Sequence, residues 1–231
     1  MNQPFGVPNQ SVEYGAITQM RNRVLRNTYW LLALSMIPTV LGAYIGLVTG
    51  VAASLSGVVG LVVFFAGAFG FIYAIEKTKN SSMGVLLLLA FTFFMGVMLS
   101  RLLSVILGMG NGTQLVMTAF AGTAAVFATM ATIATTTKRD FSGAGKWLMV
   151  GAIVIIVTAL LNAFVFQSTA MMAALSAAAI ALFSFWLMYD IKRIVDGGET
   201  NYISATLSLY LSVFNIFQNL LMLLGIFGGE D

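Results

Sequence analysis

Long stretches without a charged side chain constrain this chain more than any other feature. Lys, Arg, Asp and Glu are absent from five long intervals, which cover residues 27–75, 80–100, 102–137, 147–189 and 200–229. A transmembrane helix needs about 20 apolar residues to cross a hydrocarbon core of about 30 Å. Each interval therefore holds one or two spans. With 59% hydrophobic and 8% charged residues, the chain is predicted to turn its outer face to lipid rather than water.

The longer intervals divide at turn-forming residues. The first is expected to break between Gly46 and Gly57, and further breaks are expected at the glycine-rich run 108–112 and the polar run 167–169. Seven spans result, over roughly 28–49, 54–75, 83–107, 114–137, 147–167, 170–191 and 204–228. We expect an all-α membrane protein built as a bundle of seven transmembrane helices, with a polar tail over residues 1–24 and a transmembrane domain over residues 25–231.

The basic residues predict the orientation of this bundle. Loops on the cytoplasmic side of a membrane protein are enriched in Lys and Arg close to the ends of the spans. Seven spans with a cytoplasmic N-terminus place every Lys and Arg except Arg101 on the inner side. Those inner residues are Arg21, Arg23, Arg26, Lys77, Lys79, Lys138, Arg139, Lys146, Lys192 and Arg193. The tail is then cytoplasmic, and the C-terminus lies on the outer side of the membrane.

Composition also excludes several kinds of chemistry. The chain has no Cys and no His, which removes thiolate nucleophiles, disulfides, Cys/His metal sites and Ser-His triads. No phosphate-binding glycine motif or metalloprotease motif is present. We therefore expect no enzyme, no cofactor and no bound metal. The net charge of +3 comes from loop residues, so it does not indicate nucleic-acid binding.

A polar stripe runs along the last predicted span. Its five members fall within about 80° of one another on a helical wheel of 100° per residue; they are Ser204, Ser208, Ser212, Asn215 and Asn219. Lipid cannot hydrogen-bond these side chains, so the stripe should face the bundle interior, with the last helix packed inside. Two interpretations stay open: hydrogen bonds between helices, or a hydrated cavity.

Asp190 closes the sixth predicted span and is followed by Lys192 and Arg193. A carboxylate near the membrane surface can be solvated or paired with a basic neighbour. If it is instead buried against the polar stripe, it becomes a candidate proton sensor. Both placements agree with the sequence.

Three stretches of this chain resemble one known family. The run from Asp196 to Gly225 resembles the last-helix signature of the Bax inhibitor-1 (transmembrane BAX inhibitor motif) family. The segments Val24–Tyr29 and Lys138–Ser142 are similar to the bacterial YccA branch of that family. The resemblance extends over nearly the whole chain, and it implies the same seven-span architecture.

The resemblance implies two functions. Members of the YccA branch are substrates and inhibitors of the membrane-anchored AAA protease FtsH, which implies that this protein modulates membrane-protein quality control. Such a role requires a cytoplasmic tail for the protease to grip.

Other family members are pH-sensitive calcium leak pores gated by paired aspartates, and here Asp190 matches the first aspartate. Ser212 stands where those members have the second, so the alternative function is a calcium or cation leak with an altered gate. Lys77 is then a candidate basic partner of Asp190.

Overall fold

The computed structural model describes residues 10–51 and 57–228. Seven helices among them are long and apolar enough to cross a membrane, which confirms the predicted fold class. The helices are α1 (Gln10–Thr49), α3 (Gly57–Thr78), α4 (Ser82–Leu107), α5 (Gly112–Thr136), α6 (Ala144–Leu161), the short π-helix η1 (Asn162–Phe166), α7 (Thr169–Val195) and α8 (Tyr202–Gly228).

The helices break where turn-forming residues interrupt the apolar intervals. The helix α1 ends at Thr49 and α3 begins at Gly57, while four residues, 108–111, separate α4 from α5. Between η1 and α7 the break falls at Gln167, whose φ of 48° lies in the left-handed region. These positions confirm the division into seven spans.

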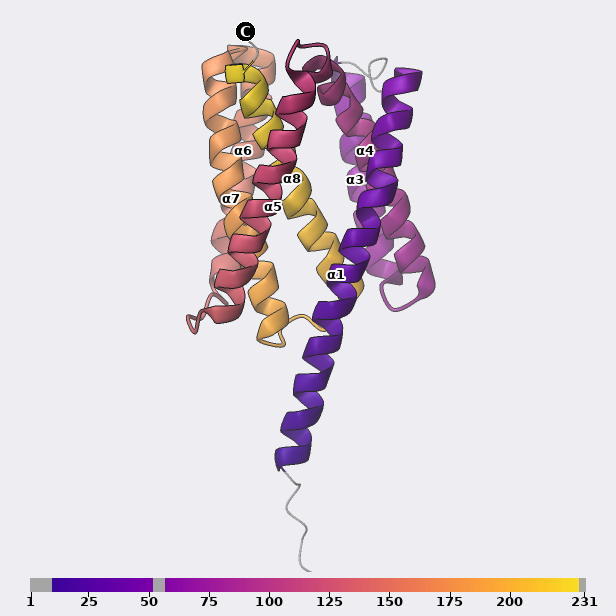
Figure 1. Cartoon of the computed structure of the whole chain (residues 1–231), viewed down its shortest axis with the longest axis vertical. Coiled ribbons are helices and arrows are strands. Elements are labelled where there is room, and N and C mark those ends of the chain that lie inside the picture. The colour runs from indigo at the N-terminus through magenta and orange to yellow at the C-terminus, as the bar shows by residue number, and fades with distance from the viewer. Residues whose placement is uncertain (1–9, 52–56, 229–231) are drawn as a thin grey trace, which may run out of the picture.

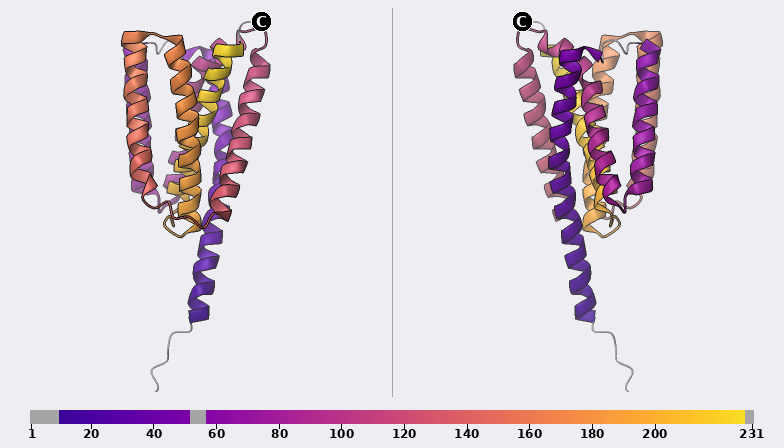
Figure 2. Two further views of the ribbon diagram at one scale, coloured as in Figure 1. Left: turned by 90° about the vertical axis from the view of Figure 1, so that its left-hand side faces the viewer. Right: turned by 90° about the vertical axis from the view of Figure 1, so that its right-hand side faces the viewer.

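The helix α8 occupies the centre of the bundle. It packs against α1, α3, α4, α5 and α7, and its large side chains Tyr210, Leu209 and Ile216 are fully buried. Figure 1 shows α8 crossing behind α5 and α1, and Figure 2 shows α6 and α3 at the periphery. The last helix is therefore packed inside, as its polar stripe predicts.

Close backbone contact joins α1 to α4. A Cβ atom added to Gly96 of α4 would meet the carbonyl oxygen of Thr39, and one added to Gly42 of α1 would meet the carbonyl oxygen of Phe93. Small residues allow helices to approach in this way where no hydrophobic effect drives them together. Gly50, which continues the spacing of Gly42 and Gly46, instead has a φ of +64° and follows the last residue of α1.

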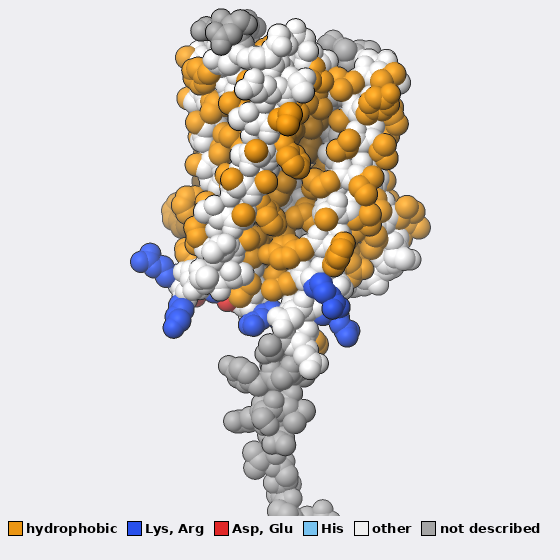
Figure 3. Space-filling view, viewed as in Figure 1, with side chains coloured by type: hydrophobic (Ala, Val, Ile, Leu, Met, Phe, Trp, Pro, Cys, Tyr) orange, Lys and Arg blue, Asp and Glu red, His pale blue; other side chains and the backbone are white. Residues whose placement is uncertain are grey.

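Basic side chains gather at one end of the bundle, which we call the basic end (Figure 3). This end carries the α3–α4 turn, the α5–α6 loop and the α7–α8 loop. Arg101 is exposed and lies six residues before the end of α4, toward the opposite end. From Gln10 the predicted polar tail is helical and continuous with the first span, and Figures 1 and 2 show it projecting past the basic end. Residues 1–9 of that tail lie outside the described residues.

Candidate functional site

Asp190 is buried inside the bundle. Its side chain is on the last turns of α7, and the residue is only 5% exposed. Its Oδ2 atom is buried and has no hydrogen-bond partner. A carboxylate removed from water without partners carries a large desolvation cost. Of the two placements that the sequence left open, the structure therefore shows the buried one.

The two basic residues after Asp190 are bonded to other carboxylates. Lys192 Nζ lies 2.8 Å from Oδ1 of Asp196, and Arg193 Nη2 lies 3.4 Å from Oε2 of Glu199. Both partners belong to the segment that connects α7 to α8. The Arg193 guanidinium also lies 5.8 Å from the ring centre of Tyr189. The local cations thus bind the connecting segment, and Asp190 forms none of the ion pairs found among the side chains of residues 19–51 and 57–228.

Two further buried oxygens in the described part of the chain lack partners, and both lie on helices that contact α7. They are Oγ1 of Thr28 on α1 and Oγ of Ser204 on α8. Thr206 Oγ1, one half-turn beyond Ser204, reaches the carbonyl oxygen of Thr28 at 3.4 Å. Unpartnered buried polar atoms are rare, because each loses its hydrogen bonds to water. Three helices thus each contribute one such atom to the interior toward the basic end.

The structure does not bring Lys77 to Asp190. The side chain of Lys77 is exposed, and its Nζ lies 5.4 Å from the ring centre of Tyr73 on the same helix. Ser212, which stands in the position of the family's second aspartate, is 2% exposed. A serine there cannot share a proton with Asp190 as a carboxylate would.

The remaining members of the polar stripe are buried or half-buried. Ser204 is buried, and Ser208, Asn215 and Asn219 are half-buried. The amide of Asn215 donates to the carbonyl oxygen of Leu211, and that of Asn219 donates to the carbonyl oxygen of Asn215, both at 2.8 Å. The amides of these two side chains therefore donate to carbonyl oxygens of α8 itself rather than to a neighbouring helix.

A hydroxyl cluster at mid-depth was missed by sequence reasoning. The hydroxyl of Tyr210 on α8 lies 3.0 Å from Oγ1 of Thr39 on α1 and donates to the carbonyl oxygen of Thr92 on α4 at 3.4 Å. Tyr210 lies outside the stripe, so helical spacing gave no reason to select it. The available signal was chemical: a tyrosine deep in a span must find a partner for its hydroxyl.

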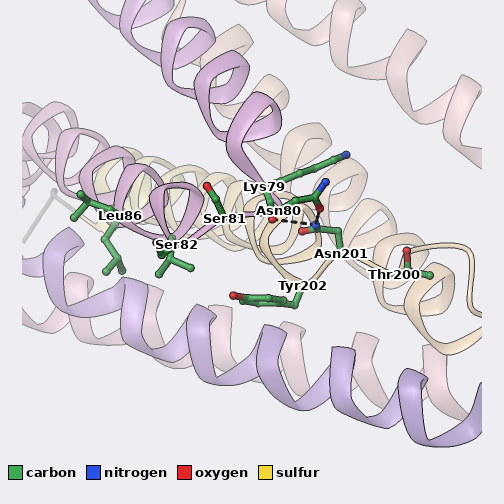
Figure 4. A pocket seen from close by; sticks show the side chains of 10 residues that line it. Lys79, Asn80, Ser81, Ser82, Leu86, Thr200, Asn201 and Tyr202 are labelled. Carbon is green, nitrogen blue, oxygen red and sulfur yellow. Dashed lines mark hydrogen bonds between the residues drawn. The ribbon is translucent and has the colours of Figure 1, made fainter. Parts of the chain in front are cut away.

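A polar cavity of about 740 Å³ opens at the basic end between the α3–α4 turn and the start of α8. Figure 4 shows the side chain of Asn201 reaching across it. Its amide donates to the carbonyl oxygen of Lys79 at 3.0 Å and to Oδ1 of Asn80 at 2.9 Å. Lys79 itself is hydrogen-bonded to Glu76 at 2.9 Å, and this bond raises the pKa of the lysine. Asn201 also accepts hydrogen bonds from the backbone N–H groups of Ile203 and Ser204, so one side chain caps α8 and ties it to α3 and α4.

Among the side chains of residues 19–51 and 57–228, no three acidic groups converge as a metal-ion site would require. The arrangement instead combines a buried acid, two asparagines that bond to their own helix, and paired charges after α7. These features and the seven apolar helices define the class: a polytopic helical membrane protein.

Comparison with known proteins gives the family. Residues 21–229 match the model of the family described as inhibitor of apoptosis-promoting Bax1. The chain therefore belongs to the Bax inhibitor-1 family, as its last helix indicates.

Several bacterial relatives align over most of this chain. An uncharacterized protein of Neisseria meningitidis is 39% identical over 222 residues, 95% of this chain and 97% of its own length. An uncharacterized membrane protein of Vibrio cholerae is 36% identical over the full length of both chains. The protein named "Modulator of FtsH protease YccA" from Escherichia coli is 37% identical over 210 residues, 91% of this chain and 92% of its own length.

Proposed function

We propose that this protein binds an FtsH-type membrane protease, as substrate and as inhibitor, and so modulates membrane-protein quality control. One observation carries the proposal: the similarity to the Escherichia coli modulator of FtsH protease covers 91% of the chain. The proposed role is regulation rather than catalysis. The proposed location is the bacterial inner membrane, with the N-terminus and the basic end in the cytoplasm, in keeping with the excess of Lys and Arg there.

The shape of α1 supports this role. The helix projects past the basic end, where a cytoplasmic AAA protease could grip it (Figure 2). The same helix is held inside the membrane by its backbone contact with α4 at Gly42 and Gly96. A pull on the projecting part must therefore separate two closely packed helices. A chain that is easily gripped but slowly extracted would occupy the protease and inhibit it.

The experiment removes the projecting part and leaves the span. Deleting residues 2–18 ends just before Gln19, where the apolar span begins. We expect FtsH-dependent turnover in cells and co-purification with the protease to be lost, while thermal unfolding of the purified bundle stays unchanged. A matched control replaces residues 2–18 by an unrelated polar helical segment of the same length. Turnover of the deletion variant at the wild-type rate would contradict the proposal.

The second candidate function is a pH-sensitive leak of calcium or another cation with an altered gate. The observation that favours it is the buried carboxylate of Asp190, whose Oδ2 has no partner. Such a group inside a membrane bundle is a candidate for an ion or proton pathway. Calcium-loaded liposomes containing the purified protein should then release the ion, and Asp190→Asn should change the rate.

Asp196→Asn is the matched control, because Asp196 is half exposed and pairs with Lys192. Ser212→Asp, which restores the second carboxylate, should alter how release depends on pH. Release no faster than from protein-free liposomes between pH values of about 6 and 8, where buried carboxyls can titrate, would remove this candidate.

A further inference from the structure

A groove opens on the membrane-facing side of the bundle between α1 and α5. Its volume is about 930 Å³, and its walls run from Tyr29 to Leu47 on α1 and from Val116 to Phe127 on α5. Residues of α8 around Phe214 form its floor, and Leu103 of α4 lies at its side. Figure 3 shows this hollow on the front of the molecule, lined by apolar side chains. We call it the lateral groove.

The three buried hydroxyls of the lateral groove are already hydrogen-bonded. Thr39 and Tyr210 are hydrogen-bonded to each other, and Thr123 donates to the carbonyl oxygen of Ala119 at 2.7 Å. The other residues on its walls and floor are apolar or aromatic, apart from two further tyrosines. A site whose hydroxyls are already paired binds hydrocarbon. A partner helix, which gains much of its affinity in membranes from interhelical hydrogen bonds, would find no free group among these three hydroxyls.

The size of the lateral groove fits lipid chains. Tyr29 and Leu47 are 18 residues apart, or about 27 Å along the helix, nearly the thickness of the hydrocarbon core. At about 30 Å³ for each small group, a volume of 930 Å³ holds about as many methylene groups as the two chains of one phospholipid. A whole transmembrane helix, about 10 Å wide over this length, would need more than twice that space.

Charge at one mouth of the groove selects the headgroup. Arg26 and Arg23 lie within two turns of Tyr29 on α1. On α5 the groove ends at Phe127, so Lys138 and Arg139, which follow Thr137, lie more than about 13 Å further toward the basic end. All four carry exposed or half-exposed side chains, and they form none of the ion pairs in the described part of the chain. The nearby acid, Asp140, is bonded to Ser142. Figure 3 shows basic side chains on both sides of the lower mouth.

We propose that the lateral groove binds one anionic phospholipid, with its acyl chains between α1 and α5 and its phosphate at the basic end, next to Arg26 and Arg23. Unpaired Lys and Arg on the inner side of a membrane protein attract anionic headgroups. The site is independent of protease binding, so either proposal can fail without the other.

The first test fills the groove. Ala124 lines it, whereas the neighbouring Ala125 is equally exposed but lies outside it. An indole at position 124 displaces more than two methylene groups of a chain, so Ala124→Trp should lower lipid occupancy at least about tenfold. Ala125→Trp should leave it unchanged. Occupancy is measured by native mass spectrometry of protein purified from membranes and then titrated with phosphatidylglycerol.

The second test removes the charges. The double variant Arg23→Gln/Arg26→Gln should lose the preference for phosphatidylglycerol over phosphatidylethanolamine, while Arg101→Gln, at the opposite end, should keep it. Far-ultraviolet circular dichroism and gel filtration confirm that each variant is folded. Equal lipid occupancy in Ala124→Trp and Ala125→Trp would overturn the proposal. So would a change of oligomeric state in Ala124→Trp without loss of lipid, since a second copy would then occupy the groove.

Discussion

Among single residues, Asp190 has the surroundings least favourable to a charged side chain. The carboxylate is buried with one oxygen unpartnered, while the cations two and three positions later bond to Asp196 and Glu199. The sequence could select this residue, because an acid at the end of a span is unusual. The sequence could not reveal that the neighbouring cations pair with other carboxylates, because this depends on how the segment after α7 folds back toward that helix.

A prediction at this scale concerns Gly96. Gly96→Ala places a Cβ against the carbonyl oxygen of Thr39, and neither backbone can move without separating α1 from α4. We expect a loss of about 1–3 kcal/mol in the free energy of unfolding, which is typical of overpacking. Thermal unfolding in detergent micelles measures it.

Gly70→Ala is the matched control for this substitution. Gly70 lies inside α3 with nothing within 4 Å of an added Cβ, and alanine favours helix by up to about 1 kcal/mol. That variant should therefore be as stable as the natural protein or more so. Equal destabilisation by the two substitutions would show that α1 and α4 are not in backbone contact.

At the scale of helices and turns, Asn201 connects the start of α8 to the α3–α4 turn at the basic end. Its side chain caps α8 and bonds to Lys79 and Asn80 in the α3–α4 turn. Helix boundaries followed from glycines and from the limits of the apolar intervals, so they could be predicted. The cross-link by Asn201 could not, because its two partners lie 121 and 122 positions away in the sequence.

Asn201→Ala should therefore loosen the start of α8. The loss of an N-cap alone costs about 0.5–2 kcal/mol, and two further hydrogen bonds are lost with it. We expect faster hydrogen exchange in residues 202–206 together with lower thermal stability. Asn80→Ala, which removes only one of these bonds, should show a smaller effect. If both variants exchange equally, the cap makes no measurable contribution.

For the whole molecule, the number of spans and the central position of α8 could both be predicted from the sequence, but the lateral groove could not. The uncharged intervals gave the spans, and the stripe from Ser204 to Asn219 placed the last helix inside. The groove lies between α1 and α5, which stand on either side of α8 (Figure 1), and the rings of Tyr29 and Phe127 meet at its end nearest the basic end. Apolar residues that line such a hollow look the same in sequence as those that face lipid, so hydrophobic pattern cannot separate them.

The proposed orientation can be tested directly, because the chain contains no cysteine. Gly110 and Gly143 lie in the turns at opposite ends of the bundle, and an added Cβ meets nothing within 4 Å at either position. In intact cells, a membrane-impermeant maleimide should label Gly110→Cys. It should label Gly143→Cys only after the inner membrane is permeabilised. The reverse pattern would place the basic end outside the cell.

The central position of α8 also has a consequence for biosynthesis. The ribosome delivers Tyr202–Gly228 late, after the helices that surround it have entered the membrane. Until then, α1 and α4 lack the helix whose Tyr210 hydroxyl bonds to Thr39 and to the carbonyl of Thr92. Those helices are then without their central packing partner. A nascent chain that stalls before Tyr202 thus lacks the helix against which α1, α4, α5 and α7 pack. The rate of translation then sets how long these helices remain without it and exposed to degradation.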